Sequence, residues 1–472
     1  MGFIYGLAMV LVIFEGIIIQ CEGGCAASSN RGQYAPTIDI HEDQSFLPND
    51  LIELIISKTD FKTIKKAIRW GIVHETDLVM RRILQNYIIL IEADAFHSEI
   101  FEYHFNGDSF LIFGNYRRLV LFFNKFGDQV KKIGIGYNSS SADVPHKEIN
   151  QNIIKKYARN LEELRIRNDE GFWRDISDRE NDIIFPEVKK FRIVGRSNRK
   201  KFELNLIFPK LESFKLIGSV ADANCLANVR TLKELTLCTS SIKEDQFEDI
   251  FANNKNMTKI SLSAPDRMET MQSIAKYLTK LEILEVRSPG ENFMLRINNN
   301  AIVKLPSVIH FVIIFDEMDE TFEIENPSFD MPNLKKLTLN WNRINDRIVY
   351  FINHFKELET LELSVKNFSA IKCIEKLKNI IEFTANFYEN WFQDVKNMFE
   401  QFDEKSKLQT VKFLDFYERT YRKYEKAMKQ FNIHLVNFMK PTWTISHGEQ
   451  IETGRKYLMF KRDPCTCKSG KK

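Results

Sequence analysis

The sequence predicts an α/β fold in the form of a repeat solenoid, with a parallel sheet on one side and helices on the other. Across 472 residues, the pattern apolar-x-x-apolar-x-apolar recurs twelve times between positions 130 and 413. Segments with apolar residues three and four positions apart lie between these motifs, a spacing typical of amphipathic helices. Examples are 150–160, 271–280, 346–355 and 394–402. The composition, 44% apolar and 28% charged, is that of a folded protein and excludes a disordered or fibrous chain.

The spacing of the motifs narrows the fold class. Their mean separation is about 25 residues, which lies inside the range of leucine-rich repeats. The motif from Leu334 to Asn342 also carries the asparagine of that repeat's signature, which most of the others lack. We therefore expect a leucine-rich-repeat solenoid over residues 101–435, a horseshoe of about 12 irregular units with a concave parallel sheet and convex helices. The motifs begin at Val130, Leu161, Val188, Leu211, Leu232, Met257, Leu281, Val308, Leu334, Leu358, Ile380 and Leu408.

Prolines introduce several of the motifs. Pro186 and Pro209 follow phenylalanine, and Pro332 follows methionine, each two residues before the first apolar position. Because proline has no backbone donor and cannot sit inside a helix, we expect extended backbone leading into these strands.

The first 24 residues form a segment of their own. Residues 2–19 are apolar apart from Glu15, and a run of small residues follows from Cys21 to Ala27. This order is typical of a secretory signal peptide, although no Lys or Arg precedes the apolar run. A single-pass anchor and a buried core helix are the alternatives. We expect a signal peptide over residues 1–24 and a secreted protein with no membrane attachment after its removal.

Three amphipathic segments lie within residues 41–100, ahead of the repeats. The first opens with Leu47-Pro48, and proline suits the first turn of a helix because no backbone donor is needed there. The second runs from Phe61 to Ile68 and the third from Thr76 to Leu84. We expect these segments to form a small helical module.

Three short helices ahead of leucine-rich repeats make the chain similar to the F-box/leucine-rich-repeat family. Trp70 departs from the family pattern, which has a cysteine-tryptophan pair after the second helix. The resemblance implies that this F-box-like module docks an apolar helical face onto a Skp1-type adaptor. A helical cap that seals the first repeat is the alternative. The matching residues are Leu47, Pro48, Asp50, Leu51, Ile55 and Ile64.

Together with the leader, the chain resembles the secreted salivary F-box/leucine-rich-repeat effectors of plant-feeding gall midges. That resemblance implies a substrate-binding adaptor of a cullin-RING (SCF-type) E3 ubiquitin ligase, with a Skp1-type adaptor and a cullin complex as partners. Such a protein is secreted and then acts in the cytoplasm of a host cell. The alternative is an extracellular leucine-rich-repeat binding module without a role in ubiquitin transfer. It explains the leader and the sequons at Asn138, Asn256 and Asn367, but it predicts cysteine-rich caps that the sequence lacks.

Strand alternation predicts which side chains would bind a target. In each motif, the residue before the second apolar position and those flanking the third point away from the core. The early repeats thereby align a basic strip on the concave face, which we expect to meet an acidic surface of a protein target. A solvated charged face is the alternative. A later apolar spot beside a histidine is a candidate anchor. The strip consists of Arg165, Arg167, Lys190, Arg192 and Lys215, and the spot of His310, Val312 and Ile314.

Motifs for catalysis and cofactor binding are absent from the sequence. It contains no HExxH, P-loop or nucleophile-elbow pattern, and Gly134-Ile135-Gly136 lacks the third glycine of a dinucleotide site. Nine histidines are scattered without metal-ligand spacing, and seven cysteines cannot form a disulfide framework. We therefore expect a non-enzymatic protein with no catalytic residue, metal or cofactor. The net charge of +3 excludes a wholesale polyanion binder, although not a local basic patch. No stacking-aromatic motif accompanies the basic residues near the C-terminus, so we expect no nucleic-acid partner.

The C-terminal segment is basic. Between Lys412 and Lys472 there are 14 Lys and Arg against 6 Asp and Glu. The stretch at 417–431 has helical character, and we expect it to cap the last repeat. We assign residues 436–472 to a basic C-terminal tail.

Overall fold

The computed structural model describes part of the chain, and all of the described residues belong to one compact unit, Ile56–Lys472. The leader, the six F-box-type residues, the expected helices at 394–402 and 417–431, and Asn138, Asn342 and Asn367 lie outside the described residues. In the part that is described, no helix has the length and apolar character needed to span a membrane. The described residues are 84, 87–92, 100–105, 108–113, 116–136, 149, 153–167, 184–195, 203–218, 224–238, 244–263, 268–287, 302–314, 329–341, 346–365, 379–386, 407–414, 443–450 and 455–462.

All twelve predicted motifs form β-strands. Each strand begins two residues after the first apolar residue of its motif, so that this residue lies in the core just ahead of the strand. The strands are β4 (Lys132–Gly136), β5 (Glu163–Arg167), β6 (Lys190–Val194), β7 (Ser213–Ile217), β8 (Glu234–Cys238), β9 (Lys259–Ser263), β10 (Ile283–Arg287), β12 (His310–Ile314), β14 (Lys336–Trp341), β15 (Thr360–Val365), β16 (Glu382–Asn386) and β17 (Thr410–Leu414).

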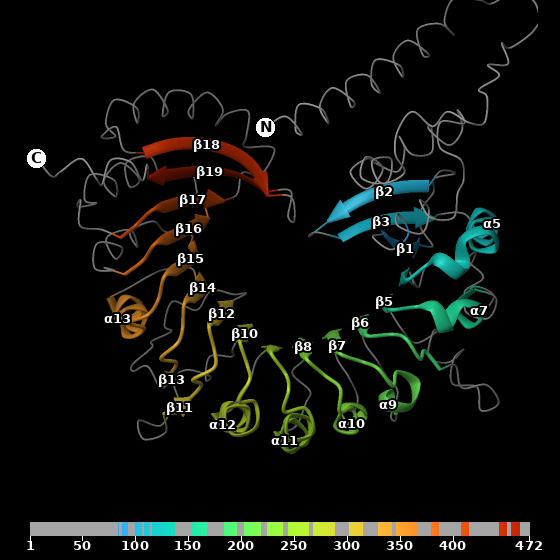
Figure 1. Ribbon diagram of the computed structural model, residues 1–472, viewed down its shortest axis with the longest axis horizontal. Helices are drawn as coiled ribbons and strands as arrows, with labels where there is room; N and C mark the ends of the chain where they lie inside the picture. Colours follow the sequence, from blue (N-terminus) through green and yellow to red (C-terminus); the bar gives the residue numbers. More distant parts are fainter. Residues whose placement is uncertain are drawn as a thin grey trace, which may run out of the picture. The chain divides into compact units, whose positions relative to one another are not determined.

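Each of these strands pairs in parallel with the strand of the next motif, so the sheet grows in chain order (Figure 1). Equivalent motif positions align across the sheet, as Leu164 does with Phe191 and Phe191 with Phe214. A parallel pair requires a crossover connection, which the segment between two motifs supplies. The fold is therefore an α/β repeat solenoid in which one motif position forms a continuous row across many strands.

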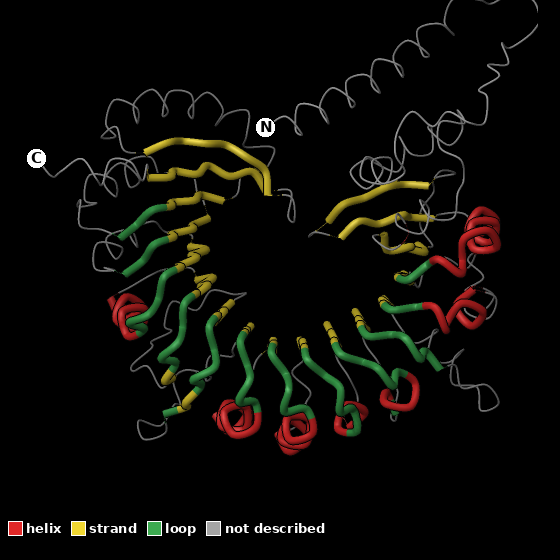
Figure 2. The backbone as a smooth tube through the Cα atoms, viewed as in Figure 1, coloured by secondary structure: helices red, strands yellow, loops and turns green. Residues whose placement is uncertain are grey.

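The core lies between the sheet and the connecting segments. In β7, Phe214 and Leu216 are buried, whereas Ser213, Lys215 and Ile217 on the other face are partly exposed. Figure 2 shows the strands on one side of the repeats and the helices on the opposite side. We call these two sides the strand face and the helix side.

Helices of different lengths occupy the helix side. The expected helices at 271–280 and 346–355 are confirmed. In the one expected at 150–160 all described residues are helical, with a π-type turn at 153–154 that continues into a short α-turn and then a 3₁₀ turn. In two neighbouring connections, β11 (Val303–Lys304) and β13 (Phe329–Asp330) pair in parallel with each other. The helices are α5 (Tyr116–Phe126), η1 (Gly127–Gln129), α7 (Lys155–Tyr157), η3 (Ala158–Asn160), α9 (Leu204–Ile207), α10 (Asn224–Ala227), α11 (Glu244–Asn253), α12 (Met268–Tyr277) and α13 (Asp346–His354).

The prolines ahead of the strands lie in tight turns, so the expectation of extended backbone there was wrong. The amide of Val188 donates to the carbonyl of Phe185 at 3.4 Å, closing a turn around Pro186. The amide of Leu211 donates to Phe208 at 3.2 Å and closes an equivalent turn. Proline presets the backbone φ angle that the second position of such a turn needs, and its missing donor costs nothing there.

The N-terminal end of the sheet was not anticipated. Tyr87–Glu92 forms β1, which pairs in parallel with β4, inside the range assigned to the helical module. The strands β2 (Ile100–Phe105) and β3 (Asp108–Phe113) form an antiparallel hairpin, and β3 pairs with β1. The sequence of β1, YIILIE, is a continuous apolar run without the repeat motif, so periodicity alone does not distinguish it from a buried helix.

The C-terminal end of the sheet corrects the assignment of residues 436–472 to a tail. Trp443–Gln450 forms β18 and Arg455–Arg462 forms β19, and the two pair antiparallel as a hairpin. Strand β19 also pairs antiparallel with β17, and Phe460 is buried against Phe413. The last repeat strand would otherwise present an unpaired edge, and the hairpin covers it.

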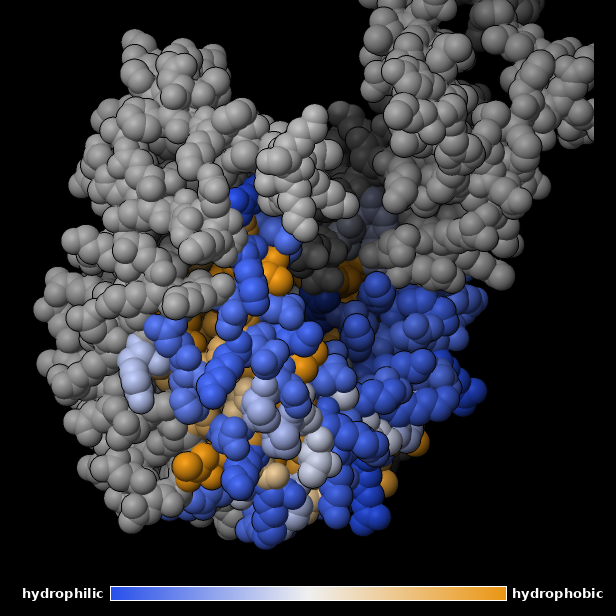
Figure 3. All heavy atoms as spheres, turned by 60° about the vertical axis from the view of Figure 1, so that its left-hand side comes forward, coloured by the Kyte–Doolittle hydropathy of each residue, from blue (hydrophilic) through white to orange (hydrophobic). Residues whose placement is uncertain are grey.

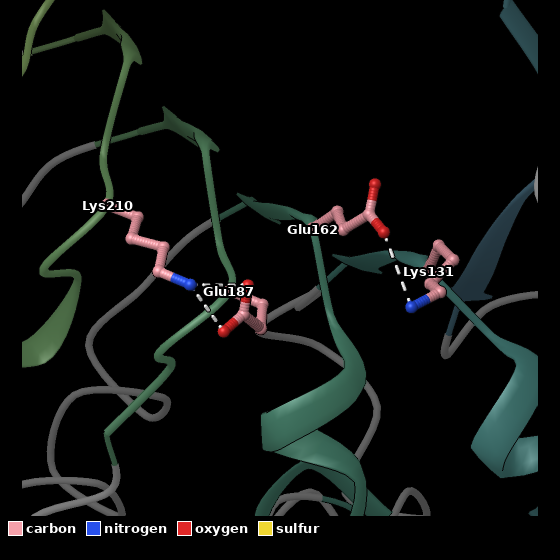
Figure 4. A network of polar contacts seen from close by, with 4 residues as sticks. All are labelled: Lys131, Glu162, Glu187 and Lys210. Atoms are coloured by element: carbon pink, nitrogen blue, oxygen red, sulfur yellow. Dashed lines mark hydrogen bonds and ion pairs between the residues drawn. The ribbon is translucent and has the colours of Figure 1, made fainter.

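Ion pairs connect neighbouring repeats beside the strand starts (Figure 4). The ammonium group of Lys131 lies 3.3 Å from a carboxylate oxygen of Glu162. That of Lys210 donates to both oxygens of Glu187, at 2.6 and 2.8 Å, and these hydrogen bonds lower the pKa of Glu187. Because these groups are solvent-exposed, each pair contributes little to the stability of the fold. They favour the observed register more than they stabilise the fold.

Candidate binding face on the strand side

The strand face presents three rows of side chains, from the first, third and fifth positions of each strand. Because the strands pair in register, the third positions form one middle row that begins with Arg165, Arg192 and Lys215. It continues through Thr236, Ser261, Glu285, Val312, Thr338 and Glu362. In the view of Figure 3, the described surface is mainly hydrophilic, with small hydrophobic patches between polar side chains.

All five residues of the predicted basic strip lie on the strand face. Arg165 is directly opposite Arg192, and Arg192 is directly opposite Lys215. These three are half-buried, whereas Arg167 and Lys190 at the strand ends are exposed. Like charges that face each other across strands repel, so neighbouring cations in this cluster disfavour one another.

Arg165 has partners within the chain. Its guanidinium group lies 2.5 Å from a carboxylate oxygen of Glu163, two residues earlier on the same strand. It also lies over the ring of Phe110 on β3, with its central carbon 5.7 Å from the ring centroid. These contacts hold Arg165 at the N-terminal border of the strip.

Lys215 is in a different situation. Burial lowers the pKa of its ammonium group, and the nearby charges of Arg192 and Arg287 lower it further. Among the described residues, Lys215 forms no ion pair with a carboxylate. An anion bound at this position would reduce the repulsion between Arg192 and Lys215.

The predicted apolar spot on β12 is smaller than expected. Val312 is only 9% exposed, so its side chain offers little surface to a partner. Its cross-strand neighbours are Glu285 and Thr338. Ile314, at the end of the strand, is half-buried and is the accessible apolar residue of this group.

His310 belongs to a hydrogen-bonded chain on the same face. Its Nε2 lies 3.1 Å from the hydroxyl of Thr338, which donates to a carboxylate oxygen of Glu362 at 3.4 Å. Lys336 lies 3.4 Å from the same carboxylate oxygen. Burial, followed by the charge of Lys336, lowers the pKa of His310 to about 4. The imidazole is therefore neutral at neutral pH and serves as a hydrogen-bonding group.

The described residues contain no group of three or more His, Cys, Asp or Glu side chains placed to hold a metal ion. The side chains on the strand face can bind a partner through charges and hydrogen bonds. Sequence alternation placed Val194 and Ile217 on this face, but it did not reveal that they are continuous with Cys238. The sequence could have indicated this row, because the three residues occupy the same motif position in successive repeats.

Comparisons with known proteins give only a distant structural similarity. No family model matches the sequence, and no curated protein is significantly similar to it. Among solved structures, the chain is similar to the leucine-rich repeat-containing protein LegL7 from Legionella pneumophila, with 14% identity and a TM-score of 0.31. The match covers 54% of this chain and 83% of that chain. At that TM-score the similarity carries no argument, so the leucine-rich repeat stays a prediction from the motif spacing, and the strand register shows an α/β repeat solenoid.

Proposed function

We propose that this chain is a binding protein that recognises a protein target with the strand face of its repeats. The observation that supports this best is the register of the sheet, which arranges side chains of successive repeats in continuous rows. Solenoid repeats commonly bind their partners with such extended surfaces. In this proposal the chain binds the target and brings it close to other proteins, and it does not catalyse a reaction.

A more specific role follows from the F-box resemblance of residues 41–100. In this proposal, the chain is the substrate-recognition subunit of an SCF-type ubiquitin ligase. Leu47, Pro48 and Leu51 dock onto a Skp1-type adaptor, and the repeats present the target to the cullin complex. Secretion followed by action in the cytoplasm of a host cell reconciles the leader with this role.

Site-specific photo-crosslinking tests the use of the strand face. A crosslinking residue placed at Ser263, on the strand face of β9, is expected to capture the target from extracts. The same residue at Leu206, which is 59% exposed on the helix side, serves as the matched control and should capture little. Equal capture from both positions, or capture from Leu206 alone, would show that the strand face is not the binding surface.

A pull-down tests the adaptor role separately. Residues 28–472 are expected to retain a purified Skp1-type adaptor, and a Leu47→Ala/Pro48→Ala/Leu51→Ala variant to lose it. An Arg167→Glu variant, altered on the strand face, should retain the adaptor as the unmodified protein does. If neither the unmodified chain nor the triple variant binds, the ligase role is rejected and residues 41–100 are better explained as a cap on the repeats.

A further inference from the structure

Net positive charge on the strand face is concentrated on three neighbouring strands. At the first, third and fifth positions, β5, β6 and β7 carry the five cations of the basic strip and one carboxylate, Glu163. At the same positions, the eight repeat strands from β8 to β17 carry four cations and four carboxylates. The basic strip is therefore a local feature and not a property of the whole face.

An apolar row runs beside these cations. Val194 lies directly opposite Ile217, and Ile217 lies directly opposite Cys238. All three are half-buried and belong to the fifth positions of β6, β7 and β8. The cations Arg192 and Lys215 lie two residues earlier on the same strands, about 7 Å away along the strand direction.

Glycine follows the apolar row on two of its three strands. Gly195 and Gly218 directly follow β6 and β7, with φ angles of 132° and 138°. A Cβ atom added to Gly218 would lie 1.9 Å from the carbonyl oxygen of Gly195, so the two turns stack in close contact. Another polypeptide can approach these glycine turns closely.

We propose that the strand face of β6–β8 binds an extended acidic segment of a protein, with carboxylates on Arg192 and Lys215 and apolar side chains on Val194, Ile217 and Cys238. An extended chain that crosses the strands between the two rows directs alternate side chains to one row and then to the other. This inference rests on the proposed use of the strand face and adds the chemistry of the partner.

An acidic protein segment fits this surface better than a nucleic acid does. The excess of cations is limited to β5–β7, and the carboxylates Glu163 and Glu234 lie at its two borders on the same face. The first, third and fifth positions of β5–β10 include no aromatic side chain, and single-stranded nucleic acids depend on stacking with aromatic rings. The apolar row has no counterpart on a phosphate backbone, whereas an amphipathic peptide matches both rows.

Fluorescence anisotropy with labelled eight-residue peptides tests the inference on the full chain. A peptide of alternating glutamate and leucine is expected to bind, with an affinity that falls as salt is raised. A Glu-Ser peptide should bind at least about tenfold more weakly because it lacks the apolar side chains, and a Lys-Leu peptide should not bind. An oligothymidylate of equal charge is the nucleic-acid probe.

Variants link the binding to the named residues. Arg192→Gln/Lys215→Gln should weaken binding of the Glu-Leu peptide at least about tenfold, and Ile217→Ser should weaken it to a similar extent. Lys259→Glu, on the strand face of β9 where the charge is balanced, is the control and should bind within about twofold of the unmodified protein. Circular dichroism checks that each variant is folded.

Three results would overturn the inference. They are unchanged binding by the double variant, equal weakening by Lys259→Glu, and tighter binding of oligothymidylate that depends on the same residues. The crosslinking at Ser263 distinguishes this failure from failure of the proposed function. If the target is still captured there while the Glu-Leu peptide does not bind, the partner chemistry is wrong and the binding face stands. If both experiments fail, both proposals are rejected.

Discussion

At the scale of single residues, Gly218 is the position most constrained by backbone geometry. Its φ angle of 138° is unfavourable for any residue with a Cβ atom, and that atom would collide with the carbonyl oxygen of Gly195. We expect Gly218→Ala to lower the free energy of unfolding by about 2 kcal/mol or more. Urea denaturation followed by circular dichroism measures the change.

Gly134 provides the matched control for this substitution. It lies inside β4 with an ordinary backbone angle, and the nearest atom to an added Cβ is the mobile end of Leu90 at 3.0 Å. Gly134→Ala should therefore cost clearly less than Gly218→Ala. Equal costs would mean that the close stacking of the two glycine turns does not constrain the fold.

His310 is expected to titrate at an unusually low pH. Its pKa is lowered to about 4 by burial and by the charge of Lys336, while the charge of Glu362 raises it. Lys336→Gln should therefore raise the pKa, and Glu362→Gln should lower it further. Selective labelling of histidine and an NMR titration of the ring measure all three values. Shifts in the opposite directions would contradict the assigned causes.

The same lowered pKa gives a direction for the pH dependence of stability. Between about pH 4 and 6.5 the unfolded chain binds a proton at His310 that the folded protein does not, so lowering the pH through this window destabilises the fold. Above about pH 6.5, His310 is neutral in both the folded and the unfolded chain, so its full contribution to stability is present there. Because the ring is only half-buried, solvent screening limits it to about 1 kcal/mol.

At the scale of elements, Asn254 joins α11 to the preceding repeat. Its side chain is 2% exposed. It accepts from the amide of Leu232 at 3.0 Å and donates to the carbonyls of Val229 at 2.7 Å and Ile250 at 2.9 Å. One amide group thus satisfies three backbone groups in two successive units, and this explains why a polar side chain is tolerated in the core.

Removing this side chain should be costly. We expect Asn254→Ala to lower the free energy of unfolding by about 2–4 kcal/mol, because three buried backbone groups lose a partner. Asn256→Ala is the control, since Asn256 is exposed and its side chain accepts one hydrogen bond from Lys280 within the described part of the chain. That change should stay within about 0.5 kcal/mol. Chemical denaturation measures the free energy of unfolding of both variants. Equal values for the two would show that the hydrogen bonds of Asn254 are not needed for stability.

At the scale of the whole sheet, the C-terminal hairpin acts as a cap. Strand β19 pairs with β17, and Phe460 is fully buried against Phe413, with ring centroids 5.9 Å apart. Repeat arrays need such terminal elements because each unit otherwise leaves one side of the core and one strand edge exposed.

A truncated chain tests the cap. A protein that ends at residue 440 should unfold at a lower temperature and should aggregate through the exposed edge of β17. A protein that ends at residue 462 retains both strands and should behave like the full chain. Phe460→Ala, which leaves the hairpin in place, should cost about 3 kcal/mol. Thermal unfolding and size-exclusion chromatography provide the readouts, and identical behaviour of the two truncations would refute the capping role.

The strands at the two ends of the sheet could not be predicted from the repeat pattern. Strands β1 and β19 carry no repeat motif, and β19 is rich in charged residues, so neither follows from the periodicity. They become strands because β4 and β17 present edges that need partners. The proline turns were missed for a related reason, since proline suits both a turn and an extended segment, and the hydrogen bond that closes the turn is visible only in the structure.

By itself, the sequence determined where each repeat strand lies and which face each of its residues occupies, because alternation of apolar residues is a local property of strand geometry. Only the tertiary structure decided which residues become neighbours. Arg192 meets Lys215 because the cores of two units, 23 residues apart, stack in register. Burial of Val312 and the lowered pKa of Lys215 likewise depend on adjacent strands. The length of the connection between two motifs varies along the chain, so no fixed spacing in the sequence specifies these contacts.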